Sequence, residues 1–290
     1  MAETRVAAVV VNYRNDVDTR RCLKRLAELP NVTVLLVNNG GGSQVEPQQW
    51  VETITSPNRG FAAACNLAIK RALAKGYEYI WLVNNDLYVE SSTLSALLGA
   101  MQAEERIAAV APKILYDDKP EMIQYAGGFA RSDCSPWFPR GDWETDTGRY
   151  DSIERVDWTS GACMLMSAQA IRDVGLLDES YFLYYEDVDW CMRAKRHDWT
   201  CLYVGTCQVR HGASRSTASV RDYYAPRALL IFLAKHYRHL LGPALRQHYH
   251  HRLLPHLRQR APKESMTDFR VYLSFLYYYI TNRFRSPAHG

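Results

Sequence analysis

The stretch Tyr79–Leu87 constrains the fold more than any other part of the sequence. Five apolar or aromatic residues run unbroken as far as Val83, and the chain then becomes polar at Asn84, Asn85 and Asp86. A short continuous apolar run is typical of a strand buried on both faces, as in a parallel sheet. Open α/β sheets bind ligands at the carboxyl ends of such strands. The oxygen atoms there suit a divalent cation that also holds phosphate, and an ordinary turn explains the same residues equally well.

Other segments repeat this alternation of buried strand and helix. Apolar runs at Val6–Val11 and Val32–Val37 end in polar residues and flank an amphipathic segment, Asp16–Leu29. A further helix is expected at Phe61–Lys75. Strand, helix and strand in succession predict an α/β fold with a parallel sheet.

The later part of the chain is less regular. We expect two short strands, at Thr200–Val204 and at Gln208–Gly212, and a helix that begins near Tyr223. The segment Arg131–Arg155 is rich in Asp, Gly and Trp and is expected to form a long loop. Long loops in compact domains are usually functional, so we interpret this one as a region that covers the substrate.

Composition excludes several classes of protein. With 47% hydrophobic and 23% charged residues, the chain of 290 residues is globular. Its seven cysteines are scattered and form no C-x-x-C pair, so neither a zinc knuckle nor a disulfide framework is expected. We expect no signal segment at the N-terminus and no apolar run of the ~20 residues that a membrane span requires. We therefore interpret the chain as a cytoplasmic protein.

Charge is unevenly distributed along the chain. Residues 217–290 contain 12 Lys and Arg against 3 Asp and Glu, whereas residues 1–216 contain 23 against 28. This asymmetry predicts an acidic catalytic part and a basic C-terminal region with an anionic partner. No nucleic-acid-binding motif accompanies the basic region. Its aromatic helices favour peripheral contact with a membrane, and packing on the catalytic part or in a homodimer fits them equally well.

Three acids within four positions, Glu186, Asp187 and Asp189, follow an aromatic segment. Carboxylates at a helix start are stabilised by the helix dipole, which is a purely structural explanation. When acids cluster beneath aromatic side chains, the pKa of one carboxyl group can also rise, and a raised pKa suits a general base. Asp189 and Arg193 are expected to pair along the helix.

Two basic side chains are candidates for binding phosphate. Arg59 precedes a helix that begins with small residues, where backbone N–H groups are free to bind anions. Tight packing against the sheet explains those small residues at least as well. His211 ends a strand and could complete a metal site with Asp86 or bind a diphosphate, although a lone histidine is usually structural.

The chain resembles the family 2 inverting glycosyltransferases of the GT-A fold, especially bacterial rhamnosyltransferase-like members that build cell-surface polysaccharides. The resemblance covers roughly Val6–Ser216, and the order and spacing of its motifs are more specific than any one of them. The motifs are Val10-Val11-Asn12-Tyr13, Val37-Asn38-Asn39-Gly40, Asn58-Arg59-Gly60-Phe61-Ala62 with Asn66, Leu82-Val83-Asn84-Asn85-Asp86, Gly161-Ala162-Cys163-Met164-Leu165, Tyr184-Tyr185-Glu186-Asp187-Val188-Asp189 and Val209-Arg210-His211-Gly212.

The resemblance implies a Rossmann-like mixed, mostly parallel sheet flanked by helices, with a C-terminal helical extension. A catalytic domain would span 1–216, with a nucleotide-sugar half at about 1–111 and an acceptor half at about 112–216. Residues 217–290 would form the basic, aromatic helical region.

The resemblance also implies roles for individual residues. Asp187 would be the general base, with Glu186 as the alternative. Asp86 ends a D-x-D-like metal motif and, with His211, would hold Mg²⁺ or Mn²⁺. Asn38 stands where the family usually has Asp, and its amide oxygen can still accept a hydrogen bond from the base. The residues implied in nucleotide-sugar binding are Asn12, Tyr13, Asn38, Asn58, Arg59, Gly60, Asn66, Asn85 and Asp86.

The implied function is that of an inverting hexosyltransferase. It would move a sugar, with L-rhamnose from dTDP-L-rhamnose as the leading donor, onto a hydroxyl of a glycan or lipid-linked acceptor at the inner face of the membrane. The alternatives are a glycosyltransferase that uses another UDP- or dTDP-sugar on a soluble small molecule, and a non-catalytic nucleotide-sugar-binding protein. A nucleotidyltransferase is disfavoured because Asn12–Asn15 contains no glycine for a nucleotide loop.

Overall fold

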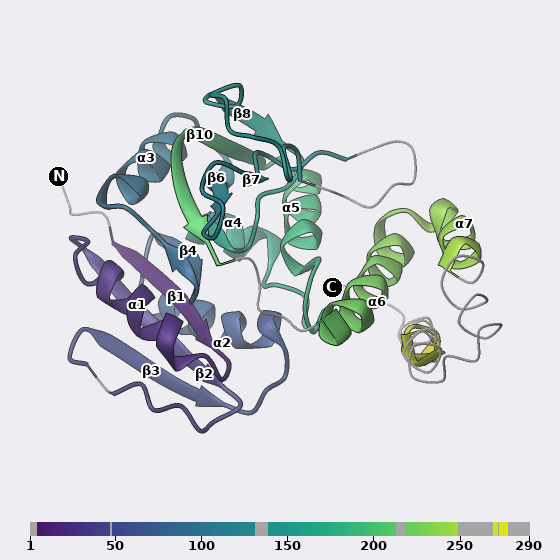
Figure 1. Cartoon of the computed structure of the whole chain (residues 1–290), viewed down its shortest axis with the longest axis horizontal. Coiled ribbons are helices and arrows are strands. Elements are labelled where there is room, and N and C mark those ends of the chain that lie inside the picture. The colour runs from purple at the N-terminus through teal and green to yellow at the C-terminus, as the bar shows by residue number, and fades with distance from the viewer. Residues whose placement is uncertain are drawn as a thin grey trace. The chain divides into compact units, whose positions relative to one another are not determined.

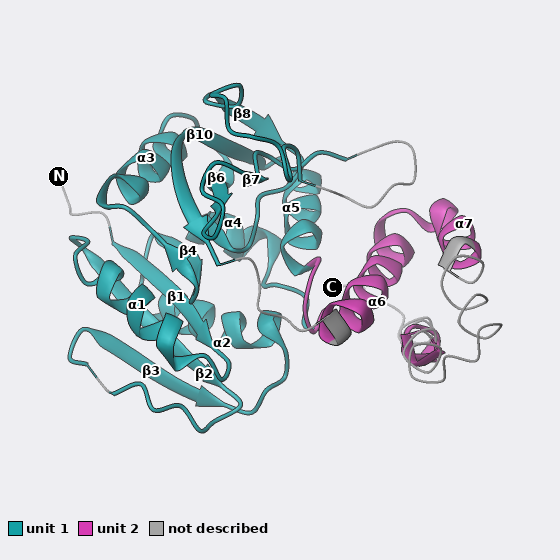
Figure 2. Cartoon of the chain, in the orientation of Figure 1, with its two compact units in different colours: residues 1–131, 137–180, 186–215 teal, residues 132–136, 181–185, 216–290 magenta. Residues whose placement is uncertain are grey.

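The computed structural model describes residues 5–46, 48–130, 139–212, 218–248, 269–271 and 273–277. The chain divides into two compact units (Figure 2). The first comprises residues 1–131, 137–180 and 186–215, and the second comprises residues 132–136, 181–185 and 216–290. Each is described by itself below.

The first unit is built on one mixed sheet of ten strands (Figure 1). The strands are β1 (Val6–Asn12), β2 (Val32–Asn39), β3 (Val51–Ser56), β4 (Tyr79–Asn84), β5 (Leu87–Tyr88), β6 (Ile107–Tyr116), β7 (Ile123–Tyr125), β8 (Ile153–Val156), β9 (Cys163–Ser167) and β10 (Thr200–His211). Its helices are α1 (Asp16–Leu26), α2 (Phe61–Ala74), α3 (Ser91–Gln102), α4 (Ala168–Val174) and α5 (Glu186–Arg196). The strand order is β3-β2-β1-β4-β9-β6-β10-β5, with β7 on β6 and β8 on β10.

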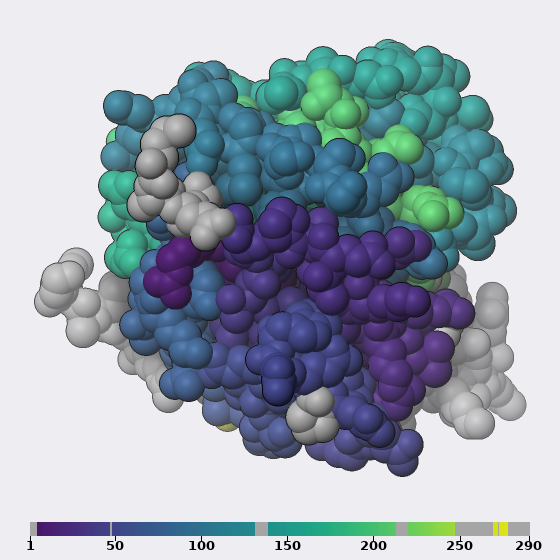
Figure 3. Space-filling view, turned by 90° about the vertical axis from the view of Figure 1, so that its left-hand side faces the viewer, coloured from purple at the N-terminus to yellow at the C-terminus, as the bar shows by residue number. Residues whose placement is uncertain are grey.

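The parallel strands β3, β2, β1 and β4 form one half of this sheet. Figure 1 shows α1 in front of this half and α2 behind it. Because helices cover both faces, the central strands are buried on both sides, as their continuous apolar runs predict. In the space-filling view the purple and blue residues of this half lie together in the lower part of the picture (Figure 3).

The other half of the sheet mixes directions. Strand β9 runs antiparallel to both β4 and β6, whereas β10 runs parallel to β6. The expectation of two strands near residues 200 and 208 was wrong, because β10 is one strand with a register shift between Val204 and Gln208. The intervening residues form a bulge, which bends a strand without ending it.

The expected long loop at 131–155 is only partly described. Residues 131–138 lie outside the described residues, and β8 begins within the expected loop, at Ile153. The role of the loop in covering substrate stays a prediction.

The second unit contains α6 (Ala218–His236) and α7 (Arg238–His248). Helix α6 begins earlier than expected and includes Pro226 in its interior. Phe182, which belongs to the same unit, stacks on Tyr224 of α6 with ring centroids 4.6 Å apart. Among the described residues, no helix is both long and apolar enough to cross a membrane.

Candidate active site

The polar ends of several strands meet at one edge of the sheet in the first unit. Asn12 of β1 lies opposite Asn38 of β2, and Val11 lies opposite Asn84 of β4. Because β9 is antiparallel to β4, its beginning reaches the same edge, where the Asn84 N–H donates to the Ala162 carbonyl at 2.8 Å. Residues far apart in sequence therefore meet where open α/β sheets bind ligands.

His211 and Asp86 meet at this edge. His211 pairs with Leu87 across β10 and β5, and its Nε2 lies 3.0 Å from Oδ1 of Asp86. The amide Nδ2 of Asn84 lies 3.2 Å from the same ring nitrogen. The structure thus brings together two residues that are separated by more than a hundred positions and that the sequence assigns to one metal site.

The Asp86–His211 pair has donor atoms that suit a divalent cation. A carboxylate oxygen is the kind of ligand that Mg²⁺ and Mn²⁺ prefer, and a neutral imidazole nitrogen is a common ligand of transition metals, to which Mn²⁺ belongs. The 3.0 Å between Nε2 and Oδ1 is the separation of an ion pair or hydrogen bond, and it also leaves both atoms within reach of one cation. Within the described residues no cluster of three or more His, Cys, Asp or Glu could hold a metal ion. The donor set therefore fits a cation that takes further ligands from a bound diphosphate.

Asn12 and Asn38 belong to a buried hydrogen-bond network. Nδ2 of Asn12 faces Oδ1 of Asp16 at 2.7 Å, Oγ of Ser43 at 3.0 Å and Oδ1 of Asn38 at 3.2 Å. Hydrogen bonds from the Gln44 backbone N–H and from Asn12 lower the pKa of the Asp16 carboxyl. The sequence analysis missed Asp16, whose only signal is its position at a helix start.

Tyr13 presents an exposed aromatic ring beside this network. Its side chain is 48% exposed and packs over Gly40, where an added Cβ would lie 3.2 Å from the ring. Nearby, Oδ1 of Asn58 accepts hydrogen bonds from the Gly60 N–H and from Nδ2 of Asn39, both at 3.1 Å. These bonds fix the turn that leads into α2, and the nucleotide-binding roles of the turn residues stay predictions.

Three other residues predicted to bind nucleotide-sugar differ in their surroundings. Asn66 is 1% exposed, and its amide is bonded to the N–H and the carbonyl of Leu177 at 3.1 and 2.9 Å. These contacts indicate that Asn66 joins α2 to a distant loop. Nδ2 of Asn85 donates to Oγ1 of Thr19 at 2.9 Å, and the Arg59 side chain is exposed. Ligand binding by all three stays a prediction.

Asp187 is held at the same edge by backbone donors. Its Oδ2 accepts from the Gly161 N–H at 2.7 Å, and its Oδ1 accepts from the Val188 N–H at 2.8 Å. A side chain at Gly161 would place a Cβ 3.1 Å from the Cβ of Asp187, so a glycine permits this close approach. Burial raises the pKa of the Asp187 carboxyl, although the backbone hydrogen bonds oppose the shift.

The two other acids of this cluster are more deeply buried. Glu186 is 6% exposed, and burial, followed by the charge of Asp187, raises its pKa to about 8. Burial therefore favours the protonated form of Glu186. The predicted pair between Asp189 and Arg193 is confirmed, with Nε and Oδ2 2.9 Å apart. Asp187 thus remains as the carboxylate best suited to accept a proton.

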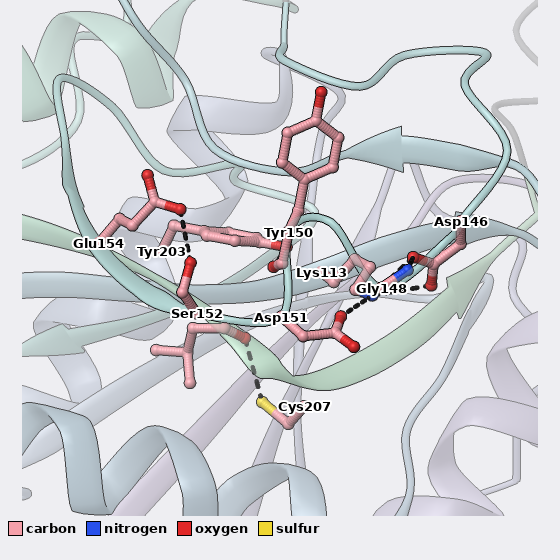
Figure 4. Close-up of polar contacts among 10 residues, drawn as sticks. Lys113, Asp146, Gly148, Tyr150, Asp151, Ser152, Glu154, Tyr203 and Cys207 are labelled. Carbon is pink, nitrogen blue, oxygen red and sulfur yellow. Dashed lines mark hydrogen bonds and ion pairs between the residues drawn. The ribbon is translucent and has the colours of Figure 1, made fainter.

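A second polar cluster, which the sequence analysis missed, surrounds Lys113 (Figure 4). Lys113 is 2% exposed and donates to both carboxylate oxygens of Asp146, at 2.7 and 2.9 Å, and to Asp151. Burial disfavours the charged ammonium group, but these hydrogen bonds outweigh it and raise the pKa of Lys113. The cluster lines a cavity of about 350 Å³ together with Gly205, Thr206, Cys207 and Gln208. It fastens the 146–151 loop to β6.

Comparison with known proteins identifies the family of this chain. Residues 2–224 match the family model described as glycosyltransferase like family 2. The chain belongs to this family. An N-acetylglucosaminyl-diphospho-decaprenol L-rhamnosyltransferase of Mycobacterium tuberculosis is 31% identical over 72% of this chain and 76% of its own length. A dTDP-rhamnosyl transferase of Shigella flexneri is 22% identical over 81% of this chain and 82% of its own length.

Solved structures support the fold of this family 2 glycosyltransferase. GalNAc-T7 with UDP, GalNAc and Mn²⁺ has a TM-score of 0.58 and 12% identity, covering 78% of this chain and 50% of that protein. A mannosyltransferase from Pyrobaculum calidifontis with GDP-Man and Mn²⁺ has a TM-score of 0.58 and 13% identity, covering 93% and 74%. The predicted GT-A fold and glycosyltransferase class are confirmed.

Proposed function

We propose that this glycosyltransferase moves L-rhamnose from dTDP-L-rhamnose to a hydroxyl group of a glycan or lipid-linked acceptor, with inversion at the anomeric carbon. The names of the mycobacterial and Shigella relatives support this donor and the lipid-linked acceptor. The observation that carries the chemistry is the Asp187 carboxylate, which Gly161 holds at the sheet edge where Asp86 and His211 meet. One base beside a diphosphate site is sufficient for a single displacement.

In the proposed reaction Asp187 accepts the proton of the acceptor hydroxyl. The hydroxyl oxygen forms a bond to the anomeric carbon as the bond from that carbon to the diphosphate oxygen breaks. The electron pair of the broken bond leaves with dTDP. Asp86 and His211 would hold Mg²⁺ or Mn²⁺, which neutralises the charge that develops on the diphosphate.

Recognition of the base is proposed to depend on Asn38. The donation from Nδ2 of Asn12 identifies the acceptor atom of Asn38 as Oδ1. An amide oxygen has a second lone pair, which can accept the ring N–H of thymine or uracil. The exposed Tyr13 ring offers a flat apolar surface beside it.

Isothermal titration with dTDP, UDP and GDP, each with and without Mn²⁺, tests the donor site. We expect dTDP to bind most tightly and to require Mn²⁺, and Asp86→Ala to remove the dependence on metal. Equal binding without metal would contradict the cation site and favour neutralisation of the diphosphate by basic side chains. No binding of any nucleotide would contradict the proposed donor.

Transfer assays separate the proposal from its alternatives. We expect rhamnose from dTDP-L-rhamnose to appear on N-acetylglucosaminyl-diphospho-polyprenol, with an anomeric configuration opposite to that of the donor. Transfer from another sugar nucleotide to a soluble acceptor would favour the broader glycosyltransferase alternative. Nucleotide-sugar binding without turnover on any acceptor would favour a non-catalytic binding protein.

The proposed lipid-linked acceptor also implies where in the cell the enzyme acts. It would act in the cytoplasm at the inner face of the membrane, with the basic residues of 217–290 in contact with anionic lipid. The aromatic residues of the same region are the candidates for a homodimer contact.

A further inference from the structure

Trp143 presents an exposed aromatic ring close to the strand end that carries His211. It is 54% exposed, although tryptophan is on average highly buried in folded proteins. Its ring stacks on that of Tyr116, with centroids 4.4 Å apart and an angle of 28° between the planes. Tyr116 is the last residue of β6 and pairs with His211 of β10. Trp143 is therefore in contact with a residue at the edge of the sheet where the candidate active site lies.

The backbone holds Trp143 in a conformation that few tryptophans adopt. Its φ of +63° lies in the left-handed region, which is strained for a bulky residue and persists only where surrounding contacts enforce it. The Trp143 N–H donates to the Ile123 carbonyl, and the Ile123 N–H donates to the Glu144 carbonyl, both at 2.8 Å. The next residue, Gln124, places its Oε1 2.6 Å from Nδ1 of His211. The same short strand, β7, therefore contacts both Trp143 and His211.

A carboxylate lies beside the two stacked rings. Oη of Tyr116 donates to Oδ1 of Asp142, the residue before Trp143, at 2.7 Å. A carboxylate can accept about four hydrogen bonds, and Tyr116 supplies one of them. Because Asp142 is only half-buried, the other positions are open to a ligand.

A flat aromatic face beside a hydrogen-bond acceptor matches the chemistry of a pyranose ring. The C–H groups on one side of such a ring form an apolar face that packs on an aromatic ring. Its hydroxyl groups point outward and donate hydrogen bonds, which are stronger to an ionised carboxylate than to a neutral acceptor. Trp143 and Asp142 together offer both kinds of contact.

The charges around Trp143 favour a neutral ligand over an anionic one. Nζ of Lys119 lies 5.0 Å from the centroid of the Trp143 ring. Such contacts are weak at exposed sites, so a ligand can displace this flexible side chain from the ring. Exposed acidic residues flank Lys119 and Trp143 in the sequence, namely Asp117, Asp118, Glu121 and Glu144. Their charges would repel a phosphate group but not the hydroxyl groups of a sugar.

We propose that Trp143 and Asp142 form a subsite for a sugar ring of the acceptor. Trp143 stacks on the apolar face of the ring, and Asp142 accepts hydrogen bonds from its hydroxyl groups. The subsite adjoins the edge at which Asp86 and His211 meet, where the acceptor must lie beside the departing diphosphate. This inference rests on the proposed glycosyl transfer and narrows the acceptor to one that presents a neutral sugar.

Steady-state transfer by the full-length protein tests the subsite, with dTDP-L-rhamnose as donor and N-acetylglucosaminyl-diphospho-prenol with a short, water-soluble tail as acceptor. The main variant is Trp143→Gly, because glycine adopts a φ of +63° without strain and so removes the ring while the turn is retained. We expect the KM for the acceptor to rise about tenfold or more, with kcat and the KM for the donor unchanged. Trp143→Phe keeps a flat ring and should retain most of the affinity, whereas Asp142→Ala should also raise the acceptor KM.

The matched control is Ile153→Ala, which removes an exposed apolar side chain of β8 in the same unit. Strand β8 pairs with residues 201–204 of β10, away from His211. This variant should keep the wild-type acceptor KM. A wild-type acceptor KM in Trp143→Gly, or an equal rise in Ile153→Ala, would overturn the proposal.

A direct binding measurement separates this inference from the proposed function. Saturation-transfer NMR with methyl N-acetyl-β-glucosaminide detects the sugar on the protein without donor or turnover. We expect a signal from the wild-type protein and from Ile153→Ala, and its loss in Trp143→Gly. If the wild-type protein transfers sugar from no donor but gives this Trp143-dependent signal, the proposed function fails and the subsite stands. Transfer with a signal and an acceptor KM that do not depend on Trp143 would leave the function and remove the subsite.

Discussion

Glu186 and Asp187 are adjacent acids in different surroundings. Glu186 is buried, and its Oε2 has no hydrogen-bond partner in the described part of the chain, whereas both oxygens of Asp187 accept backbone hydrogen bonds. Backbone donors stabilise an ionised carboxylate, and burial favours the protonated acid where an oxygen has no donor. This difference supports our proposal that Asp187, and not Glu186, is the general base.

Asp187→Asn tests the assignment of the base. Asparagine keeps an oxygen for the Gly161 N–H and nearly the same volume, but it cannot accept the acceptor's proton. We expect kcat to fall about 10²- to 10⁴-fold while dTDP affinity stays unchanged. The control is Asp157→Asn, which alters a carboxylate paired with Lys195 away from the sheet edge. Wild-type kcat in Asp187→Asn would assign the proton transfer to another group.

Glu186→Gln tests the cost of burying this acid. The folded-state pKa of about 8 lies above the ordinary value of 4.5, so between these values the folded protein binds a proton that the unfolded chain releases. The stabilising contribution is complete below about pH 4.5 and is lost as pH rises through about 8. Each pKa difference of one is worth about 1.4 kcal/mol, and we expect Glu186→Gln to flatten this decline. Urea unfolding across this pH range measures it.

The matched control for this experiment is Glu105→Gln, which changes an exposed carboxylate of the same type. It should leave the pH dependence of the unfolding free energy as in the wild-type protein. An unchanged pH dependence in Glu186→Gln would show that other groups cause the decline.

Strand β10 illustrates how one element serves two sites. Its bulge after Val204 lines the cavity at Lys113, and its last residue, His211, reaches Asp86. A regular strand has a strict two-residue alternation, and an inserted bulge resets which residues point to each face. The bulge therefore decides which face His211 occupies.

Gly205→Ala tests the bulge. A Cβ on Gly205 would lie 1.9 Å from the backbone carbonyl oxygen of Tyr150. Because the clash is with a backbone atom, the rotation of a side chain cannot relieve it. We expect the unfolding free energy to fall by about 3 kcal/mol or more, measured by urea unfolding. The control is Gly99→Ala in α3, where an added Cβ meets no atom within 4 Å and alanine should stabilise the helix by up to about 1 kcal/mol. A wild-type stability in Gly205→Ala would mean that the bulge can open without cost.

On the scale of the whole molecule, the C-terminal region and the rest of the chain have net charges of opposite sign. Residues 217–290 carry 12 Lys and Arg against 3 Asp and Glu, and the rest of the chain is net acidic. Each basic residue near an anionic lipid surface contributes about 1 kcal/mol of attraction, which salt screens. This distribution favours membrane contact through the C-terminal region.

Vesicle flotation of the full-length protein tests this contact. We expect binding to phosphatidylglycerol vesicles at low salt, loss of binding at high salt and little binding to phosphatidylcholine alone. Replacing Arg252, Arg258 and Arg260 by Gln should weaken binding. Replacing Arg20, Arg21 and Arg25 of α1 by Gln makes the same change in net charge and should not. Equal effects of the two triple variants would show that net charge, and not the C-terminal region, drives the association.

Much of the architecture was predictable because it depends on local patterns. Continuous apolar runs identify β1, β2 and β4, and the residues that follow them identify the ligand-binding edge. The direction of β9 and the continuity of β10 were not predictable, since strand pairing depends on partners distant in sequence. The start of α6 was missed because Pro226 is typical of a first turn and here lies in the helix interior.

The sequence by itself determined the family, the parallel core and the candidates Asp86, Asp187 and His211. Motif spacing and apolar runs are local properties of the sequence and do not depend on tertiary contacts. Only the tertiary structure decided that Asp86 meets His211, that burial raises the pKa of Glu186 and that Lys113 is enclosed by two carboxylates. Burial and hydrogen-bond direction set these properties. Both depend on which distant segments the sheet places side by side.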